Sequence, residues 1–150
     1  MIKTIRTNSG NQDFMDLVKH LDTELAIRDG SEHAFYAQFN KVDLIKHVVL
    51  AYDNHITVGC GAIKELSSDS MEVKRMYTSP ESRGRGVASA VLGELEKWSS
   101  ELSYKKCLLE TGKKQPEAIA LYLKTGYKVV ANYGQYAGVV NSVCFEKELV

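Results

Sequence analysis

A glycine turn between a strand-like segment and a helix-like segment most constrains the fold of this chain. Residues 71–77 alternate in the manner of a β-strand, and apolar residues recur at helical spacing over residues 87–102. Gly84 and Gly86 fall between them, where the lack of a Cβ lets the backbone turn tightly and approach a ligand. The first turn of a helix presents unpaired N–H groups and the positive end of its dipole. The turn therefore predicts an anion site suited to phosphate or pyrophosphate.

Two familiar phosphate-binding motifs do not fit this turn. A P-loop ends in Gly-Lys-Ser/Thr, whereas Gly86 is followed by Val87. A dinucleotide-binding fingerprint requires a third glycine at the position that Ser89 occupies. Arg83 and Arg85 add positive charge at the mouth of the turn. From these residues alone, an ordinary turn without a ligand stays an open alternative.

A third pattern, Q/R-x-x-G-x-G/A, does fit, and it is met by Arg83, Gly86 and Ala88. In this pattern the chain resembles the acetyl-CoA-binding loop of the GNAT-type N-acetyltransferases. Residues 72–88 are then similar to the fourth strand, pyrophosphate loop and third-helix start of that family.

Two further segments extend the resemblance. Residues 108–111 are similar to the family's fifth strand, and residues 118–127 are similar to its L-Y-x-x-x-G-[FY] segment. Three ordered segments at family-like spacing are more specific than one loop. The match is strong from about residue 59 to residue 127 and weak before Val48.

Composition indicates an ordinary soluble protein, because 44% of the residues are hydrophobic and 25% are charged. The length predicts a single domain over residues 1–150. No apolar run approaches the ~20 residues that span a bilayer, and the N-terminus lacks a signal-peptide core. Nineteen basic residues balance nineteen acidic residues, which argues against nucleic acid or an anionic membrane as the main partner.

The cysteines and histidines predict neither disulfides nor a metal site. Cys60, Cys107 and Cys144 form no C-x-x-C pair and lie in apolar runs, as buried reduced thiols of a cytoplasmic protein do. The four histidines show no metal-ligand spacing with one another or with the cysteines. We therefore expect a cytoplasmic protein without a metal cofactor.

Hydrophobic periodicity predicts the order of the elements. Strands are expected at residues 3–6, 47–52, 56–64, 71–78, 106–110, 127–131 and 140–149. A first helix is expected to carry the apolar residues from Phe14 to Leu25 on one face. Further helices are expected at residues 31–40, 87–102 and 116–124. This order predicts an α/β fold of the α+β type, with one mixed sheet and helices on both faces. The resemblance implies a GNAT-like acyl-CoA N-acyltransferase fold, splayed between the fourth and fifth strands.

The resemblance also implies acetyl-CoA (coenzyme A) as the cofactor and assigns residues to it. The backbone of Met76, Tyr77 and Thr78 would pair with the pantetheine arm like an added strand, which requires a splayed neighbour. Gln115 stands where the family usually has an asparagine that contacts the cofactor. The loop residues expected to bind through their backbone are Arg83, Gly84, Arg85, Gly86, Val87 and Ala88.

The resemblance implies that Tyr122 is the general acid, because a phenol with a pKa of about 10 can protonate a departing thiolate. From the residue alone, Tyr122 could equally be a core tyrosine packed beside Ile119 and Leu123. Glu110 stands at the spacing of the catalytic base in ribosomal-protein acetylating members of the family. Glu72 is the rival base, and a water chain without a dedicated base is the third alternative.

Five side chains are candidates for the acceptor pocket: Arg28, Tyr36, Arg75, Tyr133 and Tyr136. An arginine near the amine site suits a carboxylate on the same molecule, because a guanidinium can bind it through two hydrogen bonds. We therefore expect transfer of acetyl to a primary amine of a small, amino-acid-like molecule. The alternatives are a protein N-terminal or lysine acetyltransferase and a non-catalytic acyl-CoA-binding regulatory module. The apolar last strand would allow a homodimer.

Overall fold

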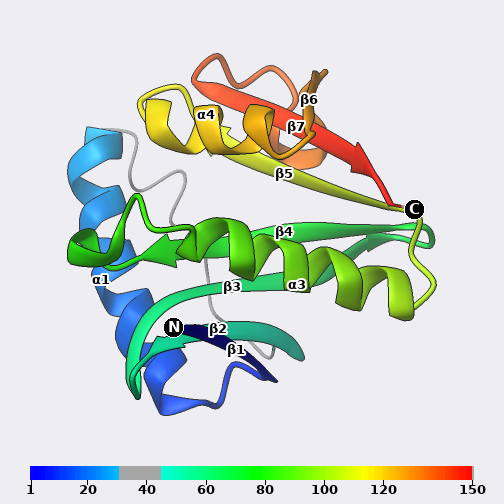
Figure 1. Cartoon of the computed structure of the whole chain (residues 1–150). Coiled ribbons are helices and arrows are strands. Elements are labelled where there is room, and N and C mark those ends of the chain that lie inside the picture. Colours follow the sequence, from blue (N-terminus) through cyan, green and yellow to red (C-terminus); the bar gives the residue numbers. More distant parts are fainter. Residues whose placement is uncertain (31–44, 150) are drawn as a thin grey trace.

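A computed structural model gives the fold, and residues 1–30 and 45–149 are described. The strands are β1 (Ile2–Thr7), β2 (His47–Asp53), β3 (Ile56–Ser67), β4 (Ser70–Thr78), β5 (Lys106–Gly112), β6 (Lys128–Val130) and β7 (Ser142–Glu148). The helices are α1 (Gln12–Asp29), α3 (Val87–Glu101) and α4 (Pro116–Lys124), with short 3-10 turns η2 (Pro80–Ser82) and η3 (Gly134–Tyr136). The described strands form one sheet in the order β1-β2-β3-β4-β5-β7-β6 (Figure 1).

Local signals explain where the first and last helices begin and end. The side chain of Asn11 accepts hydrogen bonds from the first-turn amides of α1, and Gly30 closes that helix with φ of 57°. Pro116 opens α4, where its missing N–H costs nothing. Gly126 follows α4 with φ of 99°, a left-handed conformation that favours glycine just after a helix.

Helices cover both faces of the sheet, as the sequence predicts. On one face, α1 packs Phe14, Leu17 and Val18 against β2 and β3. On the other face, α3 and α4 share one core with the sheet (Figure 1). Members of this second core include Val91, Leu92, Leu95, Leu109, Tyr122, Tyr127 and Phe145.

The α3 helix lies so close to β3 that a side chain at position 61 would force its neighbours to shift. A Cβ on Gly61 would stand 2.5 Å from Sδ of Met76 and 2.9 Å from side-chain atoms of Val91 and Leu95. The close approach brings the N-terminus of α3 down onto the sheet beside the end of β4.

The sheet opens between β4 and β5. These two strands are parallel neighbours only at Ser70–Lys106, Met71–Cys107 and Glu72–Leu108, whereas the other paired strands are antiparallel. Beyond Glu72 the two strands separate, and β5 continues to Gly112 paired only with β7. Figure 1 shows them together at one end and apart at the other. The predicted splay between the fourth and fifth strands is confirmed.

A β-bulge interrupts β4 just past this opening. Arg75 and Met76 together stand opposite the single residue Gly61 of β3, and Arg75 has φ of 58°. The extra residue lets both Lys74 and Arg75 lie on the α1 side, where Arg75 reaches Asp22. The alternation that predicts a plain strand over residues 71–77 is therefore broken.

Other differences from the expected elements are small. β3 continues to Ser67, so the turn before β4 is tighter than predicted. The last strand begins at Ser142 rather than at residue 140. The helix expected at residues 31–40 lies outside the described residues. Within residues 1–30 and 45–149, every helix is too short or too polar to cross a membrane.

Candidate active site

The loop after β4 ends in an open helix N-terminus. Gly84 and Gly86 have φ of 78° and 82°, and a Cβ at either position would project into open space. Gly86 begins α3, its carbonyl accepts from the amide of Ala90, and among the described residues no side chain caps the helix. The first-turn amides of α3 therefore lack intrahelical partners, so the loop fits a pyrophosphate as the sequence predicts.

The loop arginines fasten the loop to the rest of the fold. Arg83 donates from Nε to the carbonyl of Thr78 at 2.9 Å and from Nη2 to Glu24 of α1 at 2.8 Å. Its guanidinium also lies 5.5 Å from the centre of the Tyr77 ring. Arg85 donates to Asp53 at the end of β2, at 3.0 Å. The cofactor loop is thereby held against α1 and β2.

Two adjoining hollows occupy the opening between β4 and β5. The hollow nearer the loop is lined by Tyr77, Thr78, Arg83 and Ala88. The second is lined by Glu72, Arg75, Glu110 and Tyr136. Six residues line both: Leu21, Leu25, Met76, Gln115, Ala118 and Tyr122. Of the expected cofactor residues, Gly84, Arg85, Gly86 and Val87 line neither hollow; the others line one or both, and the three expected catalytic residues line the second.

Tyr122 packs in the core and also reaches the cleft. It is 6% exposed, and its ring centre lies 5.8 Å from those of Tyr127 and Phe145. Burial raises the pKa of Tyr122 above its ordinary value of about 10, and the nearby charge of Glu110 raises it further. The hydroxyl therefore keeps its proton at neutral pH, so a packing role and a proton-donating role are compatible.

The two candidate bases lie in the second hollow and have different partners. Glu72 is 7% exposed, accepts a 2.6 Å hydrogen bond from the Tyr133 hydroxyl, and lies 3.7 Å from Nζ of Lys74. Glu110 accepts a 2.7 Å hydrogen bond from the hydroxyl of Ser142 on β7. Burial and the adjoining Glu72 raise the pKa of Tyr133, so Tyr133 acts as the donor.

The loop between β6 and β7 brings Tyr136 to the lining of this hollow and Tyr133 to Glu72, although Tyr133 itself lines neither hollow. Tyr136 is 3% exposed, and its ring meets that of Tyr133 edge to face at 5.8 Å. Burial, with the charges of Glu110 and Glu72, raises the pKa of Tyr136. Tyr133 therefore contacts Glu72, and Tyr136 lies near both carboxylates.

Arg75 is the most deeply buried charged side chain of the cleft. Its side chain is 1% exposed, and Nη2 donates to Oδ1 of Asp22 at 2.6 Å. Nε and Nη1 are buried and have no hydrogen-bond partner among the described residues. The thiol of Cys60 on β3 donates to the Arg75 carbonyl at 3.3 Å.

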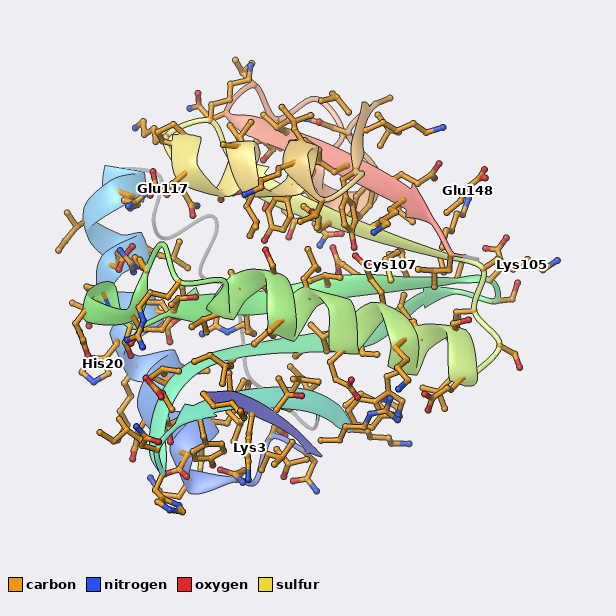
Figure 2. The ribbon with its side chains drawn as sticks, viewed as in Figure 1. Lys3, His20, Lys105, Cys107, Glu117 and Glu148 are labelled. Atoms are coloured by element: carbon orange, nitrogen blue, oxygen red, sulfur yellow. The ribbon has the colours of Figure 1, made fainter. Side chains whose placement is uncertain are left out.

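The other two acceptor candidates are placed differently. Arg28 pairs with Glu24 at 3.4 Å and with Glu117 at the start of α4, and it lines neither hollow. Figure 2 shows Glu117 at the end of α4 that approaches α1. Arg28 therefore joins the two helices across the mouth of the cleft. Tyr36 lies outside the described residues.

Sequence reasoning did not single out Asp22 of α1 or Ser142 of β7. Asp22 binds Arg75 from 53 positions away, and Ser142 binds Glu110 from 32 positions away. Neither has a local pattern that marks it. The regular spacing of Leu17, Leu21 and Leu25 is the one signal that places α1 against the sheet beside the cleft.

Comparisons with known proteins agree with this geometry. Residues 13–127 match the model of the acetyltransferase (GNAT) family. A protein named IAA acetyltransferase from Azospirillum brasilense is 37% identical over 93 residues, which cover 61% of this chain and 61% of that protein. The chain thus matches about three fifths of that relative's length.

Solved structures share the whole fold. A Klebsiella pneumoniae protein, named as a candidate acyl-CoA N-acyltransferase, has a TM-score of 0.83 and 26% identity and covers 100% of this chain and 99% of its own. The PaiA N-acetyltransferase of Thermoplasma acidophilum, solved with coenzyme A, has a TM-score of 0.73 and 16% identity over 99% of both chains. With the splayed sheet, the glycine loop and a family match from α1 to just past α4, this chain belongs to the acetyltransferase (GNAT) family.

Proposed function

We propose that this chain transfers the acetyl group of acetyl-CoA to the primary amine of a small, amino-acid-like molecule. The amine attacks directly in a ternary complex, and Tyr122 acts as the general acid. The observation that carries the proposal is the position of Tyr122, which lines both the hollow beside the glycine loop and the hollow that contains the two carboxylates.

The chain's own groups fit acetyl-CoA. The first-turn amides of α3 and the open space around Gly84 and Gly86 suit its pyrophosphate. Past Glu72, the edge of β4 that faces the opening has no neighbouring strand among the described residues, so Met76 and Tyr77 can pair with its pantetheine amides. When bound, acetyl-CoA supplies an activated thioester at the cleft. Gln115, which lines both hollows, is placed to contact it.

Tyr122 would donate its proton to the departing sulfur. Its raised pKa keeps the phenol protonated, and the transfer relieves the negative charge that develops on sulfur. The ring contacts with Tyr127 and Phe145 fix the direction of the hydroxyl.

Glu110 is the base we favour for removing a proton from the attacking amine. Glu110 and Tyr122 line the same hollow, so the two groups can serve one reaction centre. Like Glu110, Glu72 accepts a hydrogen bond, here from Tyr133, but it also lies near the cation of Lys74, which suits a role in holding the acceptor. One water between Glu110 and the amine is sufficient for the transfer.

The test is the release of free thiol from acetyl-CoA with a panel of amines, in which the active amines carry one carboxylate. Tyr122→Phe keeps the ring, so we expect it to lower kcat by about 10²- to 10⁴-fold and to leave acetyl-CoA binding unchanged. Tyr127→Phe is the matched control. It removes a hydroxyl that donates to Glu96 in the same aromatic cluster, and Tyr127 lines neither hollow.

The outcome for Tyr127→Phe is a less stable protein with normal turnover. Higher kcat/KM for spermidine or for a peptide N-terminus than for every amino-acid-like amine would assign a different acceptor. Acetyl-CoA binding without turnover of any amine would indicate the regulatory module instead. The homodimer expected through the last strands stays a prediction.

A further inference from the structure

We infer that Arg75 is the anchor for the carboxylate of the acceptor, and that Asp22 holds it in place. The inference rests on the proposed function and assigns the recognition step to one side chain. Arg75 lines the same hollow as Glu110 and Tyr122, whereas Arg28, the other candidate cation, pairs with Glu24 and Glu117 outside it.

The guanidinium of Arg75 has more donors than the described residues satisfy. A guanidinium carries five N–H donors, and the hydrogen bond to Asp22 uses only Nη2. Nε and Nη1 are both buried without a hydrogen-bond partner in residues 1–30 and 45–149. Buried donors are paired in nearly all native proteins, by protein or by water, so these two donors require a partner that the described residues do not supply.

The charge of Arg75 is also only partly balanced. Its side chain is 1% exposed, but the side chain of Asp22 is 52% exposed, so water weakens the field of the carboxylate. A second anion at Nε and Nη1 would balance the rest of the positive charge of Arg75. The carboxylate of a small molecule has the charge and the acceptor oxygens that these donors require.

The bulge in β4 is the device that places this side chain in the hollow. Met71 and Val73 face the core under α3, and strict alternation would send residue 75 to the same side. The extra residue turns Arg75 toward α1 instead, at a φ of 58° that a residue with a Cβ rarely adopts. Strain of this kind is concentrated at functional sites.

The hollow then has opposite charges for the two ends of an amino acid. Arg75 would bind the carboxylate, while Glu72 and Glu110 give the ammonium group a negative environment before it loses its proton. A zwitterion is matched at both ends, whereas a polyamine would place a cation against Arg75. The acceptor class is therefore an amine that carries one carboxylate.

The experiment compares each active amino acid with its carboxamide, which has the same side chain and the amine in the same place. We expect Arg75→Met to raise KM for the acid by about 10- to 100-fold and KM for the amide by less than about threefold. Because KM for each substrate is compared between variant and wild type, the different basicity of the two amines does not affect the result. Asp22→Asn should raise KM for the acid with little change in kcat, as expected of a positioning residue.

Arg6→Met is the matched control, because Arg6 forms ion pairs with Glu94 and Glu101 on α3 and lines neither hollow. In Arg6→Met, the ratio of KM for the acid to KM for the amide should equal that of the wild type. An unchanged ratio in Arg75→Met, with acetyl transfer intact, overturns the inference and leaves the proposed function standing.

Thermal unfolding separates the anchor from a purely structural ion pair. A structural role predicts a large loss of Tm in Arg75→Met, whereas removal of a poorly compensated buried charge should leave Tm unchanged or higher. Millimolar amino acid, without acetyl-CoA, should raise Tm of the wild type and leave Tm of Arg75→Met unchanged. Equal shifts in both proteins, or none in either, would refute the anchor even if no amine were acetylated.

Discussion

The hydroxyl of Tyr133 donates a 2.6 Å hydrogen bond to Oε2 of Glu72, and the two residues are 61 positions apart. The bond fastens the loop between β6 and β7 to β4 at the last residue before the sheet opens. It holds a buried carboxylate and shapes one wall of the second hollow at the same time.

Removing this donor should weaken the fold and the acceptor site together. Tyr133→Phe leaves the buried Glu72 carboxylate with one hydrogen bond fewer, so we expect the free energy of unfolding in urea to fall by about 1.5–3 kcal/mol. KM for the acceptor should rise. Tyr104→Phe is the control, because Tyr104 also donates to a carboxylate, that of Glu65, but at the surface. Tyr104→Phe should change neither the free energy of unfolding nor KM for the acceptor. Equal losses of stability in the two variants would contradict the importance of burial.

A negative charge at the start of α3 should abolish cofactor binding. In Gly86→Asp the side chain would project into the space assigned to the pyrophosphate, and the residue would be strained at φ of 82°. We expect acetyl-CoA to raise Tm of the wild type and not of the variant. Gly138→Asp reproduces the strain at φ of 79° with equally open surroundings, away from the loop. Its Tm should still rise with acetyl-CoA, and an unresponsive wild type would count against the cofactor site.

The contact between α3 and β3 predicts opposite effects for two glycine substitutions. Gly61→Ala forces a Cβ against Met76, Val91 and Leu95, which should destabilise the fold by about 1–3 kcal/mol. Gly93→Ala adds a Cβ in open space within α3 and should stabilise it by about 0.5–1 kcal/mol. Urea unfolding of both variants provides the measurement. Equal effects would mean that the helix can shift away from β3.

The raised pKa of Tyr122 fixes the alkaline side of the pH–rate profile. A general acid acts while protonated, so activity is lost as pH rises through its pKa, which here lies above the ordinary value of about 10. We expect kcat/KM to increase with pH as the acceptor amine loses its proton, and to stay level up to about pH 10. Tyr122→Phe should lower the whole profile. A decline between pH 8 and pH 9 would show that another group is the acid.

Local chemistry made one part of the site predictable from the sequence. Gly84 and Gly86 mark a turn that only residues tolerant of positive φ can form, and both have that conformation. Tyr122 could be located on its helix by periodicity, although only the family resemblance gave it a role. The opening of the sheet likewise came from the resemblance, because no local pattern distinguishes a strand that loses its neighbour halfway along.

The bulge at Arg75 could not be predicted in this way. Residues 71–77 read as a regular strand, and the extra residue is accommodated by a glycine and a thiol on β3, Gly61 and Cys60. Such compensation depends on a partner strand more than ten residues away. The same limit applies to Asp22, which is an unremarkable helix residue until the fold brings it to Arg75.

The departure of β5 from β4 leaves a strand edge that no other described strand pairs with. Proteins commonly shorten, charge or cover such edges to avoid aggregation. Here the edge is recessed beneath α1, whose Leu21 and Leu25 line the opening. A coenzyme that pairs with this edge would take the place of a neighbouring strand and prevent the edge from pairing with another protein molecule. Self-association during storage, measured by light scattering, should accordingly be greatest in the cofactor-free protein.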